Sequence, residues 1–277
     1  MKTAMNKEIK AMSGSTDKIL QALEAEQIRR LNLTKEDLQK SYRKLAEQNF
    51  PDDQRIRFIA DLGACKDAAY HYRLICKDWE EDKKLHLESS FDQHGREGIE
   101  FLFERLDNVG EERLRIDTAF LTAQLLSNMK HRDFYASFCN RLIPILISLA
   151  DTDDVVFRQK GIIALVWVGT SEEIDFLARK MLADDGLCRA WSATSLMQLS
   201  FHRGNAEEIR ERTKMVFLQA ISEETEWYPC GIIIAAAQTI FGKRWISSSD
   251  VENEVFEKIE KAQKSAIRFL GKSENNK

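Results

Sequence analysis

The sequence of 277 residues is poor in the residues that interrupt regular structure, with only three prolines and twelve glycines. This scarcity argues against an all-β fold, whose many turns need both residue types. The five cysteines are odd in number and include no C-x-x-C pair, so we expect reduced, buried thiols and not a disulfide framework. No apolar run approaches the roughly 18 residues of a membrane span, and the first ten residues lack the apolar core of a signal peptide. We therefore expect a cytoplasmic protein that does not enter a membrane.

Motifs of the common enzyme classes are missing as well. The chain contains no H-E-x-x-H, no G-x-x-x-x-G-K-[ST], no G-x-G-x-x-G and no G-x-S-x-G. The five histidines are scattered, and the paired carboxylates fall at expected helix ends, where capping and solvation explain them. We find no catalytic residues, metal site or cofactor site, and we predict a protein that is not an enzyme. The formal net charge of −4 argues against a nucleic-acid partner, because phosphates require a basic surface.

The sequence does contain extensive helical periodicity. Hydrophobic residues make up 43% of the chain, enough for a packed core, and they recur at spacings of three and four. The pattern predicts an all-α fold in which the helices after residue 95 come in pairs. We predict first helices at about 96–108, 134–150, 171–184 and 205–222, second helices at about 112–128, 154–169, 186–201 and 227–241, and a last helix at about 250–270.

Two of the second helices share a residue pattern. In each, an acidic turn is followed by an apolar residue, by Arg158 or Arg189, and then by small residues and leucine; the two arginines are 31 residues apart. This pattern resembles the second helix of a HEAT-like repeat, a family whose antiparallel helix pairs stack into an α-solenoid, or α-α superhelix. Arg115 and Pro229 take the same register position in the flanking second helices. The resemblance implies that acidic turn residues pair with the arginines of an adjoining repeat; these residues are Asp151, Asp153, Asp154, Asp184 and Asp185.

The resemblance divides the chain into five parts. Residues 1–14 are expected to be a frayed N-terminus, and 15–94 a helical region that is either degenerate repeats or a separate capping bundle. Residues 95–245 carry the HEAT-like repeats. A C-terminal capping helix at 246–270 and a tail at 271–277 complete the chain.

A concave groove is the candidate binding site. In HEAT-like second helices, the positions five and nine residues after the register residue tend to face the concave side. These positions, with Trp191 at two residues after the register, predict a groove with much aromatic and amide character and little charge. Its residues are Phe120, Gln124, Ile163, Trp167, Trp191, Thr194, Gln198, Ile234 and Gln238. Amides both donate and accept hydrogen bonds, and aromatic side chains anchor many protein interfaces. The alternative is that Phe120, Ile163 and Trp167 pack against neighbouring helices.

Two functions from different classes fit this reading. The leading hypothesis is a non-enzymatic, protein-binding α-solenoid scaffold or adaptor, with a bacterial immunity or inhibitor protein as a special case. The second is a HEAT-like DNA glycosylase acting on alkylated DNA; that resemblance would place Trp167 and Trp191 against DNA and make Asp117 or Asp175 the carboxylate. Similar repeats also occur in lyases or chaperones for tetrapyrrole proteins, but no residue selects that reading. The partner's identity and the oligomeric state are left open.

Overall fold

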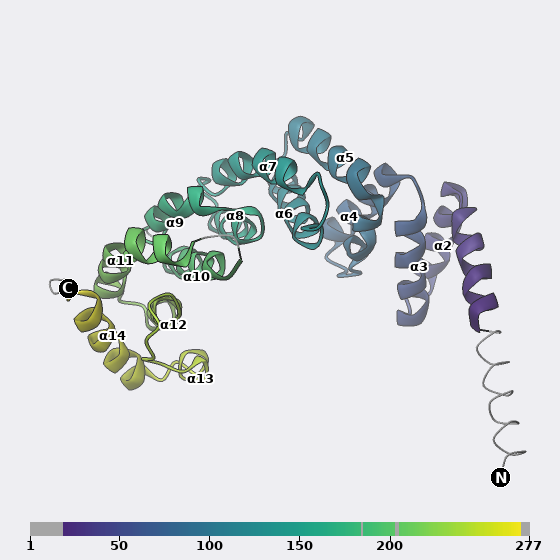
Figure 1. Cartoon of the computed structure of the whole chain (residues 1–277). Coiled ribbons are helices and arrows are strands. Elements are labelled where there is room, and N and C mark those ends of the chain that lie inside the picture. Colours follow the sequence, from purple (N-terminus) through teal and green to yellow (C-terminus); the bar gives the residue numbers. More distant parts are fainter. Residues whose placement is uncertain (1–18, 184, 203–204, 273–277) are drawn as a thin grey trace, which may run out of the picture. The chain divides into compact units, whose positions relative to one another are not determined.

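The computed structural model describes residues 19–183, 185–202 and 205–272. Every regular element in these ranges is a helix and none is a strand, which confirms the predicted all-α class (Figure 1). Residues 19–31 form the first helix described. It is followed by α2 (Lys35–Glu47), α3 (Asp52–Ala64), α4 (Ala68–Glu81), the 3-10 helix η1 (Leu87–His94), α5 (Gly95–Asn108), α6 (Glu112–Asn128), α7 (Tyr135–Leu149), α8 (Val155–Val168), the 3-10 helix η2 (Ser171–Glu173), α9 (Ile174–Lys180), α10 (Gly186–His202), α11 (Ala206–Glu223), α12 (Trp227–Ile240), α13 (Ser248–Glu252) and α14 (Phe256–Leu270).

The helix pairs after residue 95 lie close to their predicted positions, with two differences. The helix predicted at 171–184 is a short 3-10 turn followed by α9, which ends at Lys180. The single helix predicted at 250–270 is wrong, because a turn separates α13 from α14. In that turn Glu254 has a φ of 47°, and the Val255 N–H donates to the Asp250 carbonyl at 2.9 Å, which closes α13 in the manner of a Schellman motif.

The chain divides into two compact units, Met1–Phe103 and Glu104–Lys277. The domain boundary predicted between residues 94 and 95 falls at the start of α5, whereas the two units divide within that helix. The frayed N-terminus predicted at 1–14 and most of the predicted tail lie outside the described residues. None of the described helices is both long enough and apolar enough to cross a membrane.

In unit 1, local sequence signals set where the helices begin. Thr34 and Asp37 form a capping box at the start of α2: the Thr34 hydroxyl accepts the Asp37 N–H at 3.2 Å, and the Asp37 carboxylate accepts the Thr34 N–H at 3.2 Å. Pro51 precedes α3, and Asp67 caps α4 by accepting the Tyr70 N–H at 2.8 Å. The helices pack through α2 on α3, and through α3 and α4 on η1.

In unit 2, the second helix of each pair contacts the second helix of the next. Thus α6 packs on α8, α8 on α10 and α10 on α12, while the first helices α7, α9 and α11 form another row alongside them (Figure 1). Asp154 and Asp185 cap α8 and α10 by accepting the N–H groups of Phe157 and Cys188 at 3.0 and 2.7 Å. These acidic turn residues therefore act as helix caps.

Close packing between the second helices uses the small and leucine positions of the repeat pattern. Leu165 of α8 and Leu196 of α10 have no exposed surface, and the Ser195 hydroxyl donates to the Ile162 carbonyl at 3.3 Å across the two helices. At Gly161 an added Cβ would lie 3.0 Å from the Ala150 Cβ and 3.1 Å from its backbone nitrogen. Glycine at this position therefore lets the end of α7 approach α8.

Candidate functional site

An ion pair with little solvent contact connects α10 to the turn between α11 and α12 in unit 2. Arg189 of α10 donates through Nε and Nη2 to Oε2 and Oε1 of Glu224, at 2.8 and 2.9 Å. The Glu224 side chain has no exposed surface, and its Oε1 also accepts the N–H groups of Thr225 and Glu226 at the entry to α12. Glu226 lies 3.5 Å from the same guanidinium. This carboxylate therefore fixes α10 against the turn that joins the two helices of the next pair.

The predicted Asp–Arg ladder differs from this arrangement in its acidic members. The partner of Arg189 is a glutamate from the turn before α12, not one of the predicted aspartates. Asp151 pairs instead with Lys180. Arg158 donates to the backbone carbonyls of Thr152 and Asp153, at 3.1 and 3.3 Å. Asp184 lies outside the described residues.

The predicted groove residues on α6, α8 and α10 share one face. We call the seven of them the inner row, defined as Phe120, Gln124, Ile163, Trp167, Trp191, Thr194 and Gln198. Each of these side chains is partly or fully exposed. By contrast, the residues three and four positions after each register residue are buried. Because α6 packs on α8 and α8 on α10, these side chains lie at equivalent positions on successive helices. The rings of Phe120 and Trp167 meet edge to face at 4.9 Å between neighbouring helices.

On α12 the predicted register is one residue too early. Ile234, predicted to line the groove, has no exposed surface, so it cannot contribute to an open site. Gln238 uses its side-chain oxygen to accept the N–H groups of Trp245 and Ile246 at 2.9 and 3.1 Å, which holds the loop after the helix. The burial pattern of α8 and α10 reappears on α12 when Cys230, and not Pro229, is the register residue.

The position of the N-cap residue explains why the register residue of α12 is Cys230 and not Pro229. The register residue follows the N-cap by four positions in α6, α8 and α10, whose cap positions are Glu111, Asp154 and Asp185. The N-cap of α12 is Glu226, so the same rule gives Cys230. The equivalents of the inner row on α12 are then three partly or fully exposed residues: Ile232, Ala235 and Thr239.

The inner row contains no charged residue, and the charged side chains beside it on α6 and α8 pair with each other. Asp117 of α6 and Lys160 of α8 both occupy the register-plus-two position and form an ion pair across the two helices. Asp117 was one of the two carboxylates that the glycosylase reading would use, and the other, Asp175, pairs with Arg212 at 2.9 Å. Both carboxylates are thus engaged by a basic side chain.

A second surface, not predicted from the sequence, follows the N-terminal ends of the second helices. We call it the acidic edge. Val156, Leu187 and Tyr228 each lie two residues before the register residue and are 59%, 38% and 40% exposed. Trp227 is also exposed, and its ring lies 5.8 Å from that of Phe256. Acidic side chains at least partly exposed flank these apolar groups: Asp153, Asp154, Asp185, Glu223, Glu226 and Glu257.

The sequence contains a recurring pattern that indicates the acidic edge, although the groove positions do not include it. An apolar residue recurs two positions before the register residue in three successive repeats once α12 is aligned on Cys230. A hollow of about 400 Å³ lies along the acidic edge, and its lining includes Leu182, the carboxylates Glu223, Glu224 and Glu226, and Arg189, which pairs with Glu224. The edge therefore combines exposed apolar side chains with negative charge.

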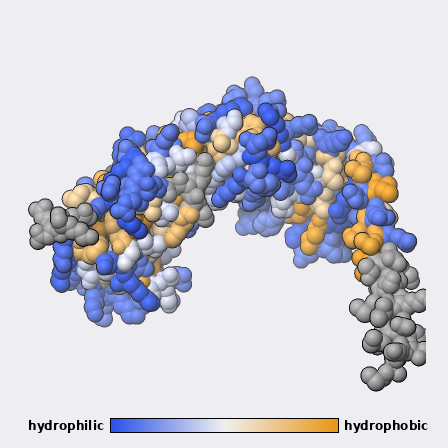
Figure 2. Space-filling model, viewed as in Figure 1, coloured by the Kyte–Doolittle hydropathy of each residue, from blue (hydrophilic) through white to orange (hydrophobic). Residues whose placement is uncertain are grey.

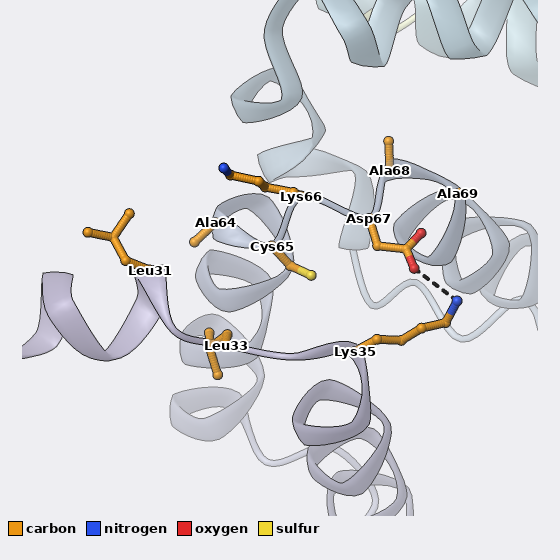
Figure 3. A pocket seen from close by; sticks show the side chains of 9 residues that line it. All are labelled: Leu31, Leu33, Lys35, Ala64, Cys65, Lys66, Asp67, Ala68 and Ala69. Atoms are coloured by element: carbon orange, nitrogen blue, oxygen red, sulfur yellow. Dashed lines mark ion pairs between the residues drawn. The ribbon is translucent and has the colours of Figure 1, made fainter.

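Unit 1 has a pocket of about 630 Å³ between the end of the first helix and the α3–α4 loop (Figure 3). Its walls are Leu31, Leu33, Lys35, Ala64, Cys65, Lys66, Asp67, Ala68 and Ala69. Lys35 and Asp67 form an ion pair at 2.9 Å across one side, while the Lys66 side chain points away from that pair (Figure 3). The lysine and the aspartate neutralise each other, and most of the other walls are apolar side chains.

A buried histidine pair lies nearby in unit 1. His71 has no exposed surface; its Nε2 lies 2.8 Å from the Leu87 carbonyl and its Nδ1 2.9 Å from Nε2 of His94. The carbonyl can only accept, so His71 carries its proton on Nε2, and His94 donates to the bare Nδ1. Burial lowers the pKa of His71 to about 4, and it also lowers the pKa of His94. Both rings are therefore neutral at pH 7.

Among the described residues, no group of three or more His, Cys, Asp or Glu side chains is arranged to hold a metal ion. No family model, no curated protein and no solved structure matches the chain.

Proposed function

We propose that the protein is a non-enzymatic, HEAT-like α-solenoid module that binds another protein, and that the inner row and the acidic edge form its contact surface. The solenoid is supported by the succession of contacts α6–α8–α10–α12 and by a common spacing between N-cap and register residue in four helices. Repeats that stack in this way present equivalent positions side by side.

The observation that carries the proposal is the inner row. Phe120, Trp167 and Trp191 lie on three neighbouring helices, and each keeps part of its surface exposed. A folded protein normally buries such large rings, and half-exposed aromatic residues surrounded by amides are typical of the anchors of protein interfaces. The neutral balance of the row, with Asp117 held by Lys160, suits a polypeptide better than a phosphate backbone.

The acidic edge indicates the chemistry of the partner. Exposed valine, leucine and tyrosine side chains surrounded by carboxylates complement a surface with apolar residues inside a ring of lysine and arginine. We therefore propose a basic protein as partner. An inhibitor that occupies a basic toxin is one special case of this function.

The proposal is tested by affinity purification of the tagged full-length chain from its own host, comparing the native protein with Trp167→Ala and Met215→Ala. Met215 lies on α11, in the row of first helices, and is 66% exposed, so it is a matched control for loss of an exposed apolar side chain. We expect one stoichiometric basic protein with the native chain and the Met215 variant, and its loss with Trp167→Ala.

The comparison is valid only if circular dichroism shows equal helix content and similar melting temperatures for the three proteins. Co-purified nucleic acid that depends on Trp167 would favour the glycosylase alternative. A partner retained equally by all three proteins would contradict the assignment of the inner row.

A further inference from the structure

The helix at residues 19–31 exposes nearly all of its apolar side chains. Leu20, Leu23, Ile28 and Leu31 are 52%, 61%, 60% and 74% exposed. Figure 2 shows the resulting hydrophobic strip along this helix. At 100° per residue these four side chains fall within one half of the helix surface. A strip of this kind on a folded protein marks an interaction site.

The opposite, charged side of the helix holds it to the rest of unit 1. Arg29 donates to Asp61 of α3 at 2.5 Å, and Arg57 of α3 donates to Glu26 at 3.2 Å. Glu26, Arg29 and Arg30 are the half-buried residues of this helix, whereas the rest of residues 19–31 are exposed. The helix is thus attached by salt bridges, and its apolar face is directed to solvent. Surface helices normally do the reverse.

Such a helix gains little stability by itself. Thirteen residues are at the length where isolated helices are marginal in water, and exposed ion pairs contribute at most about 1 kcal/mol each. Cover over the apolar strip would provide the missing stabilisation, since each fully buried aliphatic side chain is worth about 1.5–3 kcal/mol. The remaining question is what covers it.

We propose that the strip is covered by the same helix of a second copy of this chain, packed antiparallel. The strip consists of Leu20, Leu23, Glu24, Gln27, Ile28 and Leu31. Read in the opposite direction it has the same chemistry: aliphatic residues at both ends and one polar pair in the middle. A twofold axis between positions 25 and 26 places Leu20 on Leu31, Leu23 on Ile28 and Glu24 on Gln27 of the other copy.

The polar pair at the centre selects this arrangement. The Gln27 amide can donate to the Glu24 carboxylate of the other copy, and the axis forms this contact twice. Parallel packing in register would place two Glu24 carboxylates against each other, which is unfavourable. Polar residues within an otherwise apolar helix interface commonly fix register and direction in this way.

A membrane surface is a poorer match for the strip. Helices that lie on membranes have polar faces rich in lysine and arginine, with aromatic residues at the boundary. Residues 19–31 contain two acidic and two basic side chains and no aromatic residue. The helix therefore lacks the charge that would attract it to anionic lipid.

The test is the mass of the full-length protein in solution, measured by light scattering after size exclusion and by sedimentation equilibrium over a wide concentration range. We expect a concentration-dependent species of twice the 32.0 kDa of the chain. Leu23→Glu should raise the dimer dissociation constant by about ten- to a hundredfold, because two aliphatic contacts are lost across the axis. Met215→Glu, at a site of similar exposure in unit 2, should leave it unchanged.

Gln27→Lys separates the two packing directions. In the antiparallel dimer the new lysine meets Glu24 of the other copy, so the dissociation constant falls; in a parallel dimer it would meet another lysine, and the constant would rise. Three results would overturn the proposal: a monomer at every concentration, a dimer insensitive to Leu23→Glu, or a dimer weakened by Gln27→Lys. A monomer that floats with anionic vesicles would assign the strip to membrane binding instead.

Discussion

Acidification should destabilise unit 1 through its buried histidine pair. The pKa of His71 in the folded chain is about 4, against 6.5 for a free histidine, because burial penalises the charged ring. Between pH 6.5 and pH 4 the His71 ring is therefore protonated in the unfolded state but neutral in the folded state. Stability contributed by the neutral ring is complete above pH 6.5 and is lost as the pH falls through this window.

The magnitude follows from the two pKa values. The full effect, reached near pH 4, is about 3 kcal/mol, and at pH 5 about 2 kcal/mol is already lost relative to pH 7. The pKa of His94 is also lowered by burial, although Asp67 and Asp92 partly oppose this shift, so its contribution has the same sign. Protonation of His71 would also replace its acceptor nitrogen with a donor facing the donor of His94, breaking the 2.9 Å contact.

Urea unfolding at pH 7 and pH 5 measures this loss. Trp79 is the sole tryptophan of unit 1. With phenylalanine in place of the four tryptophans of unit 2, its fluorescence reports on unit 1 alone. We expect the unfolding free energy of that background to fall by about 2 kcal/mol at pH 5. His71→Gln should remove most of the pH dependence, whereas His86→Gln, at an exposed histidine of the same unit, should retain it. Equal urea midpoints of unfolding at the two pH values would contradict this prediction, and so would a pH dependence that persists in His71→Gln.

Two further predictions concern the packing of unit 2. Leu165→Ala or Leu196→Ala should each cost about 2–5 kcal/mol in a denaturant melt, because both side chains are fully buried. Trp167→Ala should cost less than Leu165→Ala; equal costs would place the tryptophan in the core and remove it from the inner row. Glu224→Gln should cost about 3 kcal/mol, because Arg189 would keep little solvent contact and lose its buried counter-charge, leaving only the exposed Glu226 at 3.5 Å. Unfolding curves in which the Glu224 variant matches the native protein would show that the ion pair adds no stability.

The helix boundaries were predictable because their signals are local. Capping residues such as Thr34 and Asp154, and the spacing of apolar residues, act over one or two turns and can be read directly. The break between α13 and α14 was missed because a glutamate, Glu254, adopts the left-handed conformation that usually marks glycine. No local sequence signal predicts that turn.

The inner row was only partly predictable, because periodicity shows which side of a helix is apolar and not what covers it. On α12 the predicted register began at Pro229, one residue too early, and this error replaced half-buried Ala235 with buried Ile234. The same limitation hid the strip at residues 19–31. Its apolar residues have ordinary core spacing, yet the helix docks through Arg29 and Asp61. Which face a helix buries depends on its neighbours.

The inner row and the acidic edge should affect partner binding in different ways, which allows them to be tested separately. Aromatic anchors such as Trp167 act after contact, so their loss should mainly speed dissociation. Exposed carboxylates such as Asp153 and Glu226 act before contact, by attracting a basic partner, so their neutralisation should mainly slow association and reduce its dependence on salt. If dissociation changed with Glu226→Gln and association changed with Trp167→Ala, the two surfaces would have been assigned the wrong way round.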